Sequence, residues 1–412
     1  MAQPTSPATI ISDPGILAAF KEIYTNEVLE QAAVKEKDLL AWLPKKGDLY
    51  ARGIHIPIRT GRPQGMSANF KGAQASHTAS HTDQFFLTRK RYFGGISFDD
   101  ETIRASQKDI AALVDVKSGE MDDEIDAISE ELEKSLWRNG SGVVGTIAAI
   151  TTGGPSVITF VNAEDVINFS PNQYLEARTA DLITDRGGDE QVFSVAYEAG
   201  TITMTSDVAT DHGWAVGDVL IRGAKGAIAS DVNQQVTGMD SWIPKIPETS
   251  GTFLGVDRTR NVALYQGFRG SWKGTVEETL KKGVSFTGRF SAKHDTAFLP
   301  TDKHQKLDIE LGSRAIRKEG STESFGLPYI AFTAGKSYIR VYPATFCPSD
   351  TGWVLRRKDW TLHHLDGLPH LVTTDGLTQL RANDFSGTIM RFRYWCDLAC
   401  SMPKNQLRLE LK

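Results

Sequence analysis

Residues 99–139 read DDETIRASQKDIAALVDVKSGEMDDEIDAISEELEKSLWRN. Apolar side chains recur here at intervals of mostly three or four residues, which indicates one face of a long amphipathic helix. Carboxylates at the start, cations in the last turn and Asn139-Gly140 at the end are typical helix-end signals. At 1.5 Å per residue such a helix is roughly 57 Å long, too long for an ordinary helix inside a compact domain. The apolar positions are Ile103, Ile110, Val114, Met121, Ile125, Ile128, Leu132 and Leu136.

The opposite face of this predicted helix is acidic. Between residues 108 and 134, ten carboxylates face three lysines. A solvated helix face is the simplest explanation of such a pattern. The stretch that precedes the helix suggests another, in which the acidic face binds a basic partner.

Residues 49–98 are predicted to form a long β-hairpin arm. Residues 49–59 alternate apolar and polar side chains, as strands do, and residues 84–98 form the returning strand. Residues 60–83 are rich in Gly, Ser, Ala and Thr, so the arm is expected to have a soft tip and no core of its own. Its charges are strongly unbalanced, because Asp83 is the one acid that faces seven basic residues.

A basic arm beside an acidic helix predicts a contact between copies of the chain. An arm without a core cannot bury itself, and blocks of opposite charge on separate elements set register and partner choice. A nucleic-acid role for the arm stays open, because basic hairpins with aromatic residues also bind nucleic acid. The predicted inter-subunit contacts are Arg52, Arg59, Arg62, Lys71, Arg89, Lys90 and Arg91 on the arm, and Asp122, Asp123, Glu124, Glu130 and Glu131 on the helix.

Residues 153–236 are predicted to form an inserted β domain. Short β-type runs follow one another here, separated by glycine-containing turns at 185–188, 198–200 and 211–213. Evenly spaced short strands indicate a small β-barrel or sandwich with its own core. Residues 140–152 are interpreted as a glycine-containing exit from the helix. The predicted strands are Val157–Val161, Tyr174–Arg178, Gln191–Ala196, Thr201–Met204 and Val219–Arg222.

The remaining segments predict a mixed α+β body. A helix is expected from Pro14, with Asp13 as its N-cap, and it should break before Pro44. Short helices are predicted at residues 275–282 and 302–311, the second capped by Asp302. Strands are predicted at 296–299, 329–332, 337–342, 352–355, 371–373, 388–396 and 406–411.

Composition narrows the possible functions. A formal net charge of −5 and a pI near 6.0 argue against a protein that coats nucleic acid on all sides. We find no apolar run long enough for a membrane span and no signal-peptide pattern, so no membrane association is expected. The cysteines Cys347, Cys396 and Cys400 suit a reducing compartment without a disulfide framework.

No motif predicts catalysis, a metal or a cofactor. His77 and His81 have the spacing of a helical metal pair, but they lie in a Ser/Ala/Thr-rich loop without a third ligand. His363, His364, Asp366 and His370 resemble a metal or acid–base cluster but are interpreted as surface turn residues. The cysteines lack zinc spacing, and no phosphate-binding glycine motif occurs. We therefore predict a protein that is not an enzyme and holds no cofactor.

The order of these segments resembles a tailed-phage major capsid protein of the Hong Kong 97 fold. The segments that carry the resemblance are a short N-terminal arm, the hairpin (the extended loop of the family) and the long helix (its spine). FLGVDR at 253–258, TAFLP at 296–300 before a helix, and YWCDL at 394–398 add to it. No single motif is strict, and their order along nearly the whole chain makes the resemblance specific. Residues 153–236 resemble the insertion domain of some members.

The resemblance implies pentamers and hexamers that close into an icosahedral shell around double-stranded phage DNA, with each extended loop over a neighbour's spine. The implied partners are neighbouring subunits, a separate scaffolding protein, a portal and, in some members, a decoration protein. The implied location is the virion, after assembly in the host bacterial cytoplasm. Some members crosslink a loop lysine to an asparagine. Lys71 lies near the loop tip, but its partner positions are not matched, so this chemistry is not carried over.

The resemblance also gives expected domain boundaries. These are the N-terminal arm at 1–48, the extended loop at 49–98, the peripheral domain with the spine helix at 99–152, the insertion domain at 153–236, the axial domain with connecting strands at 237–345, and the return to the peripheral domain at 346–412. Two alternatives stay open. An encapsulin-type compartment around enzyme cargo has the same fold, and a hydrolase or carbohydrate-binding protein on the β insert would need paired carboxylates in a pocket there.

Overall fold

The computed structural model describes residues 37–50, 52–61, 65–99, 110–224, 231–312, 316–318, 329–335, 337–373, 380–381 and 386–411. The predicted helix from Pro14 lies outside the described residues. The chain divides into two compact units. The first comprises Met1–Ile54, Leu87–Glu133 and Thr361–Ala399, and the second comprises His55–Phe86, Lys134–Trp360 and Cys400–Lys412.

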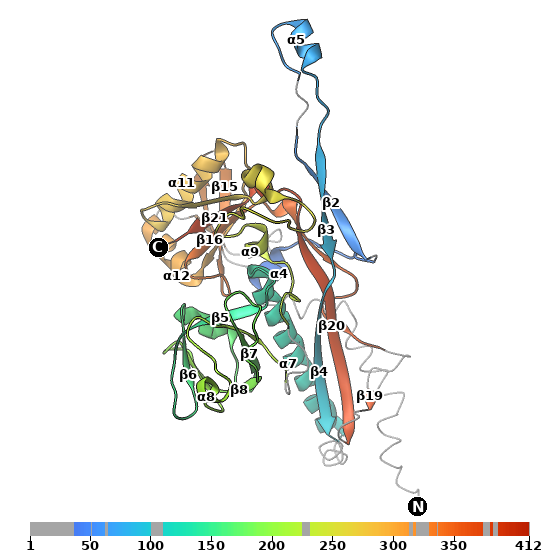
Figure 1. Ribbon diagram of the computed structural model, residues 1–412, viewed down its shortest axis with the longest axis vertical. Helices are drawn as coiled ribbons and strands as arrows, with labels where there is room; N and C mark the ends of the chain where they lie inside the picture. Colours follow the sequence, from blue (N-terminus) through green and yellow to red (C-terminus); the bar gives the residue numbers. More distant parts are fainter. Residues whose placement is uncertain are drawn as a thin grey trace, which may run out of the picture. The chain divides into compact units, whose positions relative to one another are not determined.

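A long antiparallel strand pair dominates the first unit. β4 (Lys90–Asp99) pairs with β20 (Gly387–Cys400), from Lys90 opposite Cys396 to Asp99 opposite Gly387, and the two strands run side by side in Figure 1. Together they belong to a six-stranded sheet. Its other strands are β1 (Lys45–Lys46), β17 (Trp360–His364), β18 (His370–Leu371) and β19 (Leu380–Arg381).

The predicted long helix is present as α7 (Ile110–Trp137). Its apolar stripe is buried as expected, at Met121, Ile125, Ile128, Leu132 and Leu136. The expected start at Asp99 is wrong, because Asp99 is the last residue of strand β4 and pairs with Gly387 of β20. Residues 100–109 lie outside the described part of the chain. β4 packs closely on α7, since a Cβ at Gly94 would lie 2.3 Å from both Glu124 Oε1 and Ile128 Cδ1.

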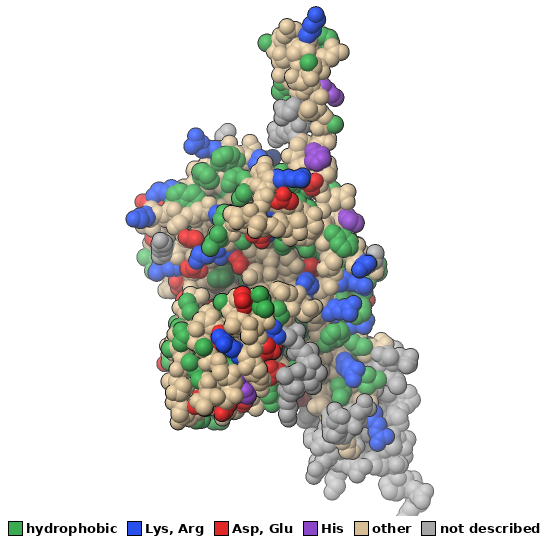
Figure 2. All heavy atoms as spheres, in the orientation of Figure 1, with side chains coloured by type: hydrophobic (Ala, Val, Ile, Leu, Met, Phe, Trp, Pro, Cys, Tyr) green, Lys and Arg blue, Asp and Glu red, His purple; other side chains and the backbone are tan. Residues whose placement is uncertain are grey.

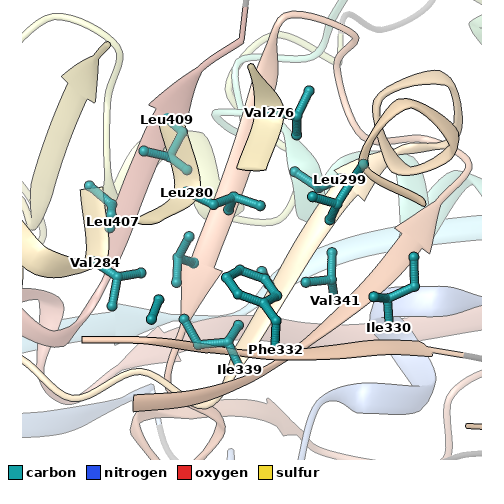
Figure 3. Packing of buried hydrophobic residues seen from close by; sticks show 14 of the residues in the cluster. Val276, Leu280, Val284, Leu299, Ile330, Phe332, Ile339, Val341, Leu407 and Leu409 are labelled. Atoms are coloured by element: carbon teal, nitrogen blue, oxygen red, sulfur yellow. The ribbon is translucent and has the colours of Figure 1, made fainter. Parts of the chain in front are cut away.

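The largest core lies in the second unit, under a seven-stranded mixed sheet. The strand order is β11 (Phe268–Ser271), β21 (Leu407–Glu410), β16 (Thr351–Leu355), β12 (Thr296–Pro300), β15 (Ser337–Ala344), β14 (Tyr329–Ala334) and β13 (Ile316–Lys318). Helices α11 (Val276–Gly288) and α12 (Thr301–Leu311) pack against this sheet. Figure 3 shows Val276, Leu280 and Val284 of α11 beside strand residues such as Leu407 and Val341.

Two helix predictions need correction here. The helix predicted for 275–282 continues to Gly288, with Thr275 as its N-cap. The second helix begins at Thr301 after Pro300, so Asp302 lies in the first turn and is not the N-cap. Proline at that point presets the backbone, and no side-chain cap is present.

The second unit also contains a closed six-stranded barrel, which confirms the predicted β insertion. Its order is β10 (Val219–Arg222), β5 (Val143–Ile150), β6 (Val157–Phe160), β9 (Thr201–Met204), β8 (Glu190–Ala196) and β7 (Tyr174–Arg178). β5 lies in the stretch interpreted as a glycine-containing exit, so that interpretation was wrong. The stacked rings of Phe160 and Phe169 pack against Gly145 of this strand. A Cβ at that position would lie only 3.0 Å from Phe160 Cδ1, which explains the glycine. The domain boundaries themselves stay a prediction.

The predicted hairpin arm consists of β2 (Gly53–Arg59) and β3 (Thr82–Thr88). Its expected return strand is divided, because Arg89 separates β3 from β4. The tip carries a short helix, α5 (Phe70–Ala75), at the end of the arm farthest from its two strands (Figure 1).

Candidate inter-subunit contact surfaces

The root of the arm is fixed in an aromatic socket of the second unit. Phe85 is fully buried, with its ring centroid 5.1 Å from that of Trp242, 6.2 Å from Phe253 and 6.3 Å from Tyr265. The Phe86 N–H donates to the Leu254 carbonyl at 2.8 Å. This socket joins β3 to α9 (Met239–Trp242) and α10 (Val262–Tyr265), and no local sequence pattern predicts it.

A buried arginine, Arg258, packs against the Phe253 ring of the socket. The guanidinium of Arg258 lies 3.8 Å from the centroid of Phe253 and donates to the Ser241 carbonyl at 2.7 Å. It also forms an ion pair with Glu248. Burial lowers the pKa of Arg258 from its ordinary value, and Glu248 opposes that shift. The Arg258 side chain therefore packs on Phe253, which in turn packs against Phe85 at the root of the arm.

The tip of the arm has no buried residue among those that the structure describes. Helix α5 contains no buried residue, and Lys71 on it is exposed. The two most exposed large apolar side chains among the described residues are here, Met66 at 91% and Phe70 at 80%. Neither residue was predicted as a contact, although both are apolar side chains in a polar, glycine-containing loop of the sequence.

Basic side chains gather at the base of the arm rather than along it. The guanidinium carbons of Arg89, Arg91 and Arg393 lie 5.7, 6.0 and 4.1 Å from the ring centroid of Trp395. Arg52 and Arg59 are exposed and Lys90 is half-buried, whereas Arg62 lies outside the described residues. Figure 2 shows Lys or Arg and hydrophobic side chains together over β4 and β20. Between residues 60 and 88, the described part of the arm contains one Lys or Arg, Lys71.

The acidic face of α7 is less solvated than the sequence suggested. Asp122 and Asp123 are exposed, and Glu124 and Glu130 are half-buried. Glu131, however, is only 3% exposed, so its side chain is not offered on the surface of its own unit. The candidate acidic surface therefore reduces to four of the five predicted residues, and its contact with another copy stays a prediction.

Two further α7 carboxylates bind groups of their own unit. Glu133 is 1% exposed, and its two oxygens accept the backbone N–H groups of Leu39 and Leu40, each at 2.8 Å. Asp126 pairs with Lys37 at 2.8 Å. The burial of Glu133 comes from α4 (Asp38–Trp42), about ninety residues earlier in the chain.

The histidine and cysteine positions show local structural roles. His77 and His81 are exposed on the arm, and His81 Nε2 lies 3.8 Å from Asp83. His363 Nδ1 lies 2.5 Å from Asp48 Oδ1. The described residues include no group of three or more His, Cys, Asp or Glu side chains suited to a metal. Burial raises the pKa of the Cys396 and Cys400 thiols well above the ordinary value.

None of the helices in the described part of the chain combines the length and the hydropathy that crossing a membrane requires.

Comparison with known structures assigns the fold. One chain of the cyanophage A-1(L) capsid asymmetric unit is 10% identical over 91% of this chain and 92% of its own, with a TM-score of 0.52. The holo-SrpI encapsulin complex of Synechococcus elongatus PCC 7942 is 8% identical, over 92% and 88%, with a TM-score of 0.44. The capsid of Myoviridae phage XM1 is 7% identical, over 91% and 91%, with a TM-score of 0.41. No protein-family model and no curated protein matches the sequence.

The first of these likenesses covers both chains nearly from end to end. The chain therefore has the α+β fold of a tailed-phage capsid protein, the Hong Kong 97 type, with a closed β-barrel inserted into it. The predicted fold class is confirmed.

Proposed function

We propose that this chain is the shell-forming subunit of a tailed-phage capsid. It assembles as pentamers and hexamers into an icosahedral shell around double-stranded DNA, and it does no catalysis. The observation that carries the proposal is the arm, whose tip helix buries no residue in its own chain. A two-stranded hairpin is marginal alone in water, and exposed apolar side chains mark interaction sites, so a neighbouring copy is the natural partner. The phage-capsid fold supports this reading.

The base of the arm supplies the proposed electrostatic contact. Arg89, Arg91 and Arg393 surround Trp395, and Asp366 pairs with Arg393 at 3.0 Å, so the described cluster keeps surplus positive charge. We propose that this surplus meets Asp122 and Asp123 of a neighbour's α7, together with Glu124 and Glu130. Such pairing sets register and partner choice more than affinity.

Electron microscopy of the expressed protein tests the shell. We expect closed particles by negative stain, either from the chain alone or with its scaffolding protein. Monodisperse small species under both conditions would contradict the proposal. The contents discriminate between shell types, because a phage capsid in infected cells protects DNA from nuclease, whereas an encapsulin-type compartment holds enzyme cargo.

Charge reversal tests the contact. The variant Arg89→Glu, Lys90→Glu, Arg91→Glu should remain folded but fail to assemble, because its arm base would face carboxylates of the same sign. Adding Asp122→Lys and Asp123→Lys should restore particles in part. Normal shells from the triple variant would refute the pairing. Unchanged far-UV and near-UV circular dichroism controls for folding.

The remaining partners follow from the same proposal. A separate scaffolding protein would act during assembly, a portal and a decoration protein would bind the shell, and packaged DNA would be contacted without sequence preference. The location would be the virion, after assembly in the bacterial cytoplasm.

A further inference from the structure

We propose that the tip of the arm docks on the insertion barrel of a neighbouring copy, with Met66 and Phe70 as its anchors. This inference rests on the proposed shell and names contact residues that the shell proposal does not contain. Three observations carry it, which are the shape of the tip, the charge of the barrel, and an apolar spot on the barrel surface.

The tip presents its apolar side chains on a built scaffold. The Asn69 side chain accepts the Lys71 N–H at 3.1 Å, and Ser67 Oγ accepts the Asn69 N–H at 3.2 Å. Gly72 fits under this turn, since a Cβ there would lie 2.6 Å from Ser67 Oγ. A pre-organised tip loses less conformational entropy on binding than a mobile loop. Met66 and Phe70 are thus held ready while remaining 91% and 80% exposed.

The charge of the tip complements that of the barrel. Residues 60–82 contain two basic residues and no Asp or Glu. Residues 143–222, which form the barrel, contain eleven Asp and Glu against three Arg, a formal charge of −8. The whole chain carries −5, so the rest of it is net positive at +3. Opposite potentials steer the two surfaces together and disfavour tip-on-tip or barrel-on-barrel contacts.

The barrel also offers an apolar spot inside this acidic surface. Tyr197 is 58% exposed and Ile167 is 38% exposed. Tyr197 lies on the β8–β9 turn, and Ile167 on the short helix η1 (Ala163–Asn168). The Tyr197 hydroxyl donates to the Phe169 carbonyl at 3.4 Å, and a Cβ at Gly200 would lie 2.8 Å from Ala163 Cβ, so turn and helix touch.

Two exposed carboxylates lie on the same elements as that spot, and its chemistry suits the tip. Glu198 follows Tyr197 on the turn, and Glu164 shares helix η1 with Ile167. A methionine sulfur and a phenyl ring both pack favourably on a tyrosine ring, and Lys71 would face these carboxylates. A second copy fits better than an unrelated protein, because every copy supplies one tip and one barrel. Such a heterologous contact generates a ring when its rotation closes, which is the arrangement that a capsomer requires.

Cysteine crosslinking in assembled particles tests the contact. The three natural cysteines are buried, so we expect them not to react with a short bis-maleimide. Phe70→Cys with Tyr197→Cys should give covalent multimers in particles and none in unassembled subunits. The matched control is Phe70→Cys with Ile183→Cys, since Ile183 is even more exposed than Tyr197, 78% against 58%, but lies on the loop at the other end of β8. Equal or absent crosslinking of the two pairs would overturn the inference.

A second variant distinguishes failure of the tip contact from failure of the shell proposal. Met66→Ser with Phe70→Ser should fold normally and should need roughly tenfold or more subunit for half-maximal assembly, as loss of a hot spot does. Lys71→Ala on the same helix should change this concentration far less. Assembly of the double variant at the wild-type concentration would overturn the tip contact alone. If wild-type protein forms no particles at all, the shell proposal fails and takes the inference with it.

Discussion

Glu133→Gln is the sharpest test of how α7 is held in the first unit. Helix α4 has no side-chain cap of its own, because the N-cap Lys37 makes no such bond, and Glu133 supplies acceptors for the Leu39 and Leu40 N–H groups. Hydrogen bonds to a charged acceptor contribute about 1.5–3 kcal/mol each. Glutamine keeps one acceptor, loses the charge and turns an NH₂ towards the second N–H, so we expect a loss of about 2–3 kcal/mol.

The measurement is amide hydrogen exchange of the peptide covering residues 37–43. A loss of that size speeds local exchange by about 30- to 150-fold, since each 1.4 kcal/mol is tenfold. Asp126→Asn is the matched control, because it makes the same chemical change seven residues earlier on the helix. Its ion pair with Lys37 is exposed on the aspartate side, 65% against 8%, and exposed pairs contribute about 0–1 kcal/mol. Exchange in the two variants within roughly twofold would refute the capping argument.

Three further predictions concern packing and titration. Phe85→Ala should cost about 3–5 kcal/mol in unfolding free energy because it empties the aromatic socket, whereas Phe85→Leu should cost under about 1.5 kcal/mol; urea titration followed by tryptophan fluorescence compares them. Gly94→Ala should cost about 1–3 kcal/mol through its clash with Ile128, while Gly95→Ala, whose Cβ would find its nearest atom at 3.5 Å, should be close to neutral in the same titration. His294 is buried, and burial lowers its pKa to about 4 from 6.5, so its contribution to stability is full above pH 6.5 and is lost as pH falls towards 4. Relative to His294→Gln, wild-type protein should lose about 3 kcal/mol between pH 7 and pH 4, and parallel pH profiles of the two proteins would contradict this.

The barrel shows what local patterns can predict. Its five predicted strands agree with the structure within a residue because each short β-type run is bounded by a turn signal. Strand β5 was not predicted because Gly145 interrupts its β-type sequence pattern. The glycine leaves room for the ring of Phe160 on β6. The start of α7 was misplaced for a similar reason. Asp99 carries a helix-start signal, yet its backbone pairs in a strand with Gly387 of β20, almost three hundred residues later.

The contact between copies stays a prediction, and the sequence could predict only the charge of the two candidate surfaces. Charge along the sequence predicted a basic arm and an acidic helix face. It could not show that Glu131 and Glu133 are buried, because the covering elements come from elsewhere in the chain. The arm-root socket was invisible for the same reason, since Phe85, Trp242 and Tyr265 share no local pattern. The apolar tip, by contrast, was readable, and Met66 and Phe70 were overlooked because the loop around them is polar.

The first and last strands of the barrel are hydrogen-bonded neighbours, with Val219 opposite Thr146. The chain therefore leaves the insertion about one strand spacing, near 4.8 Å, from where it enters. A detour with adjoining ends asks nothing of the host fold except a short gap, so evolution can splice such a module in or out, and an engineer can exchange it for foreign cargo, without resetting the register of any other sheet.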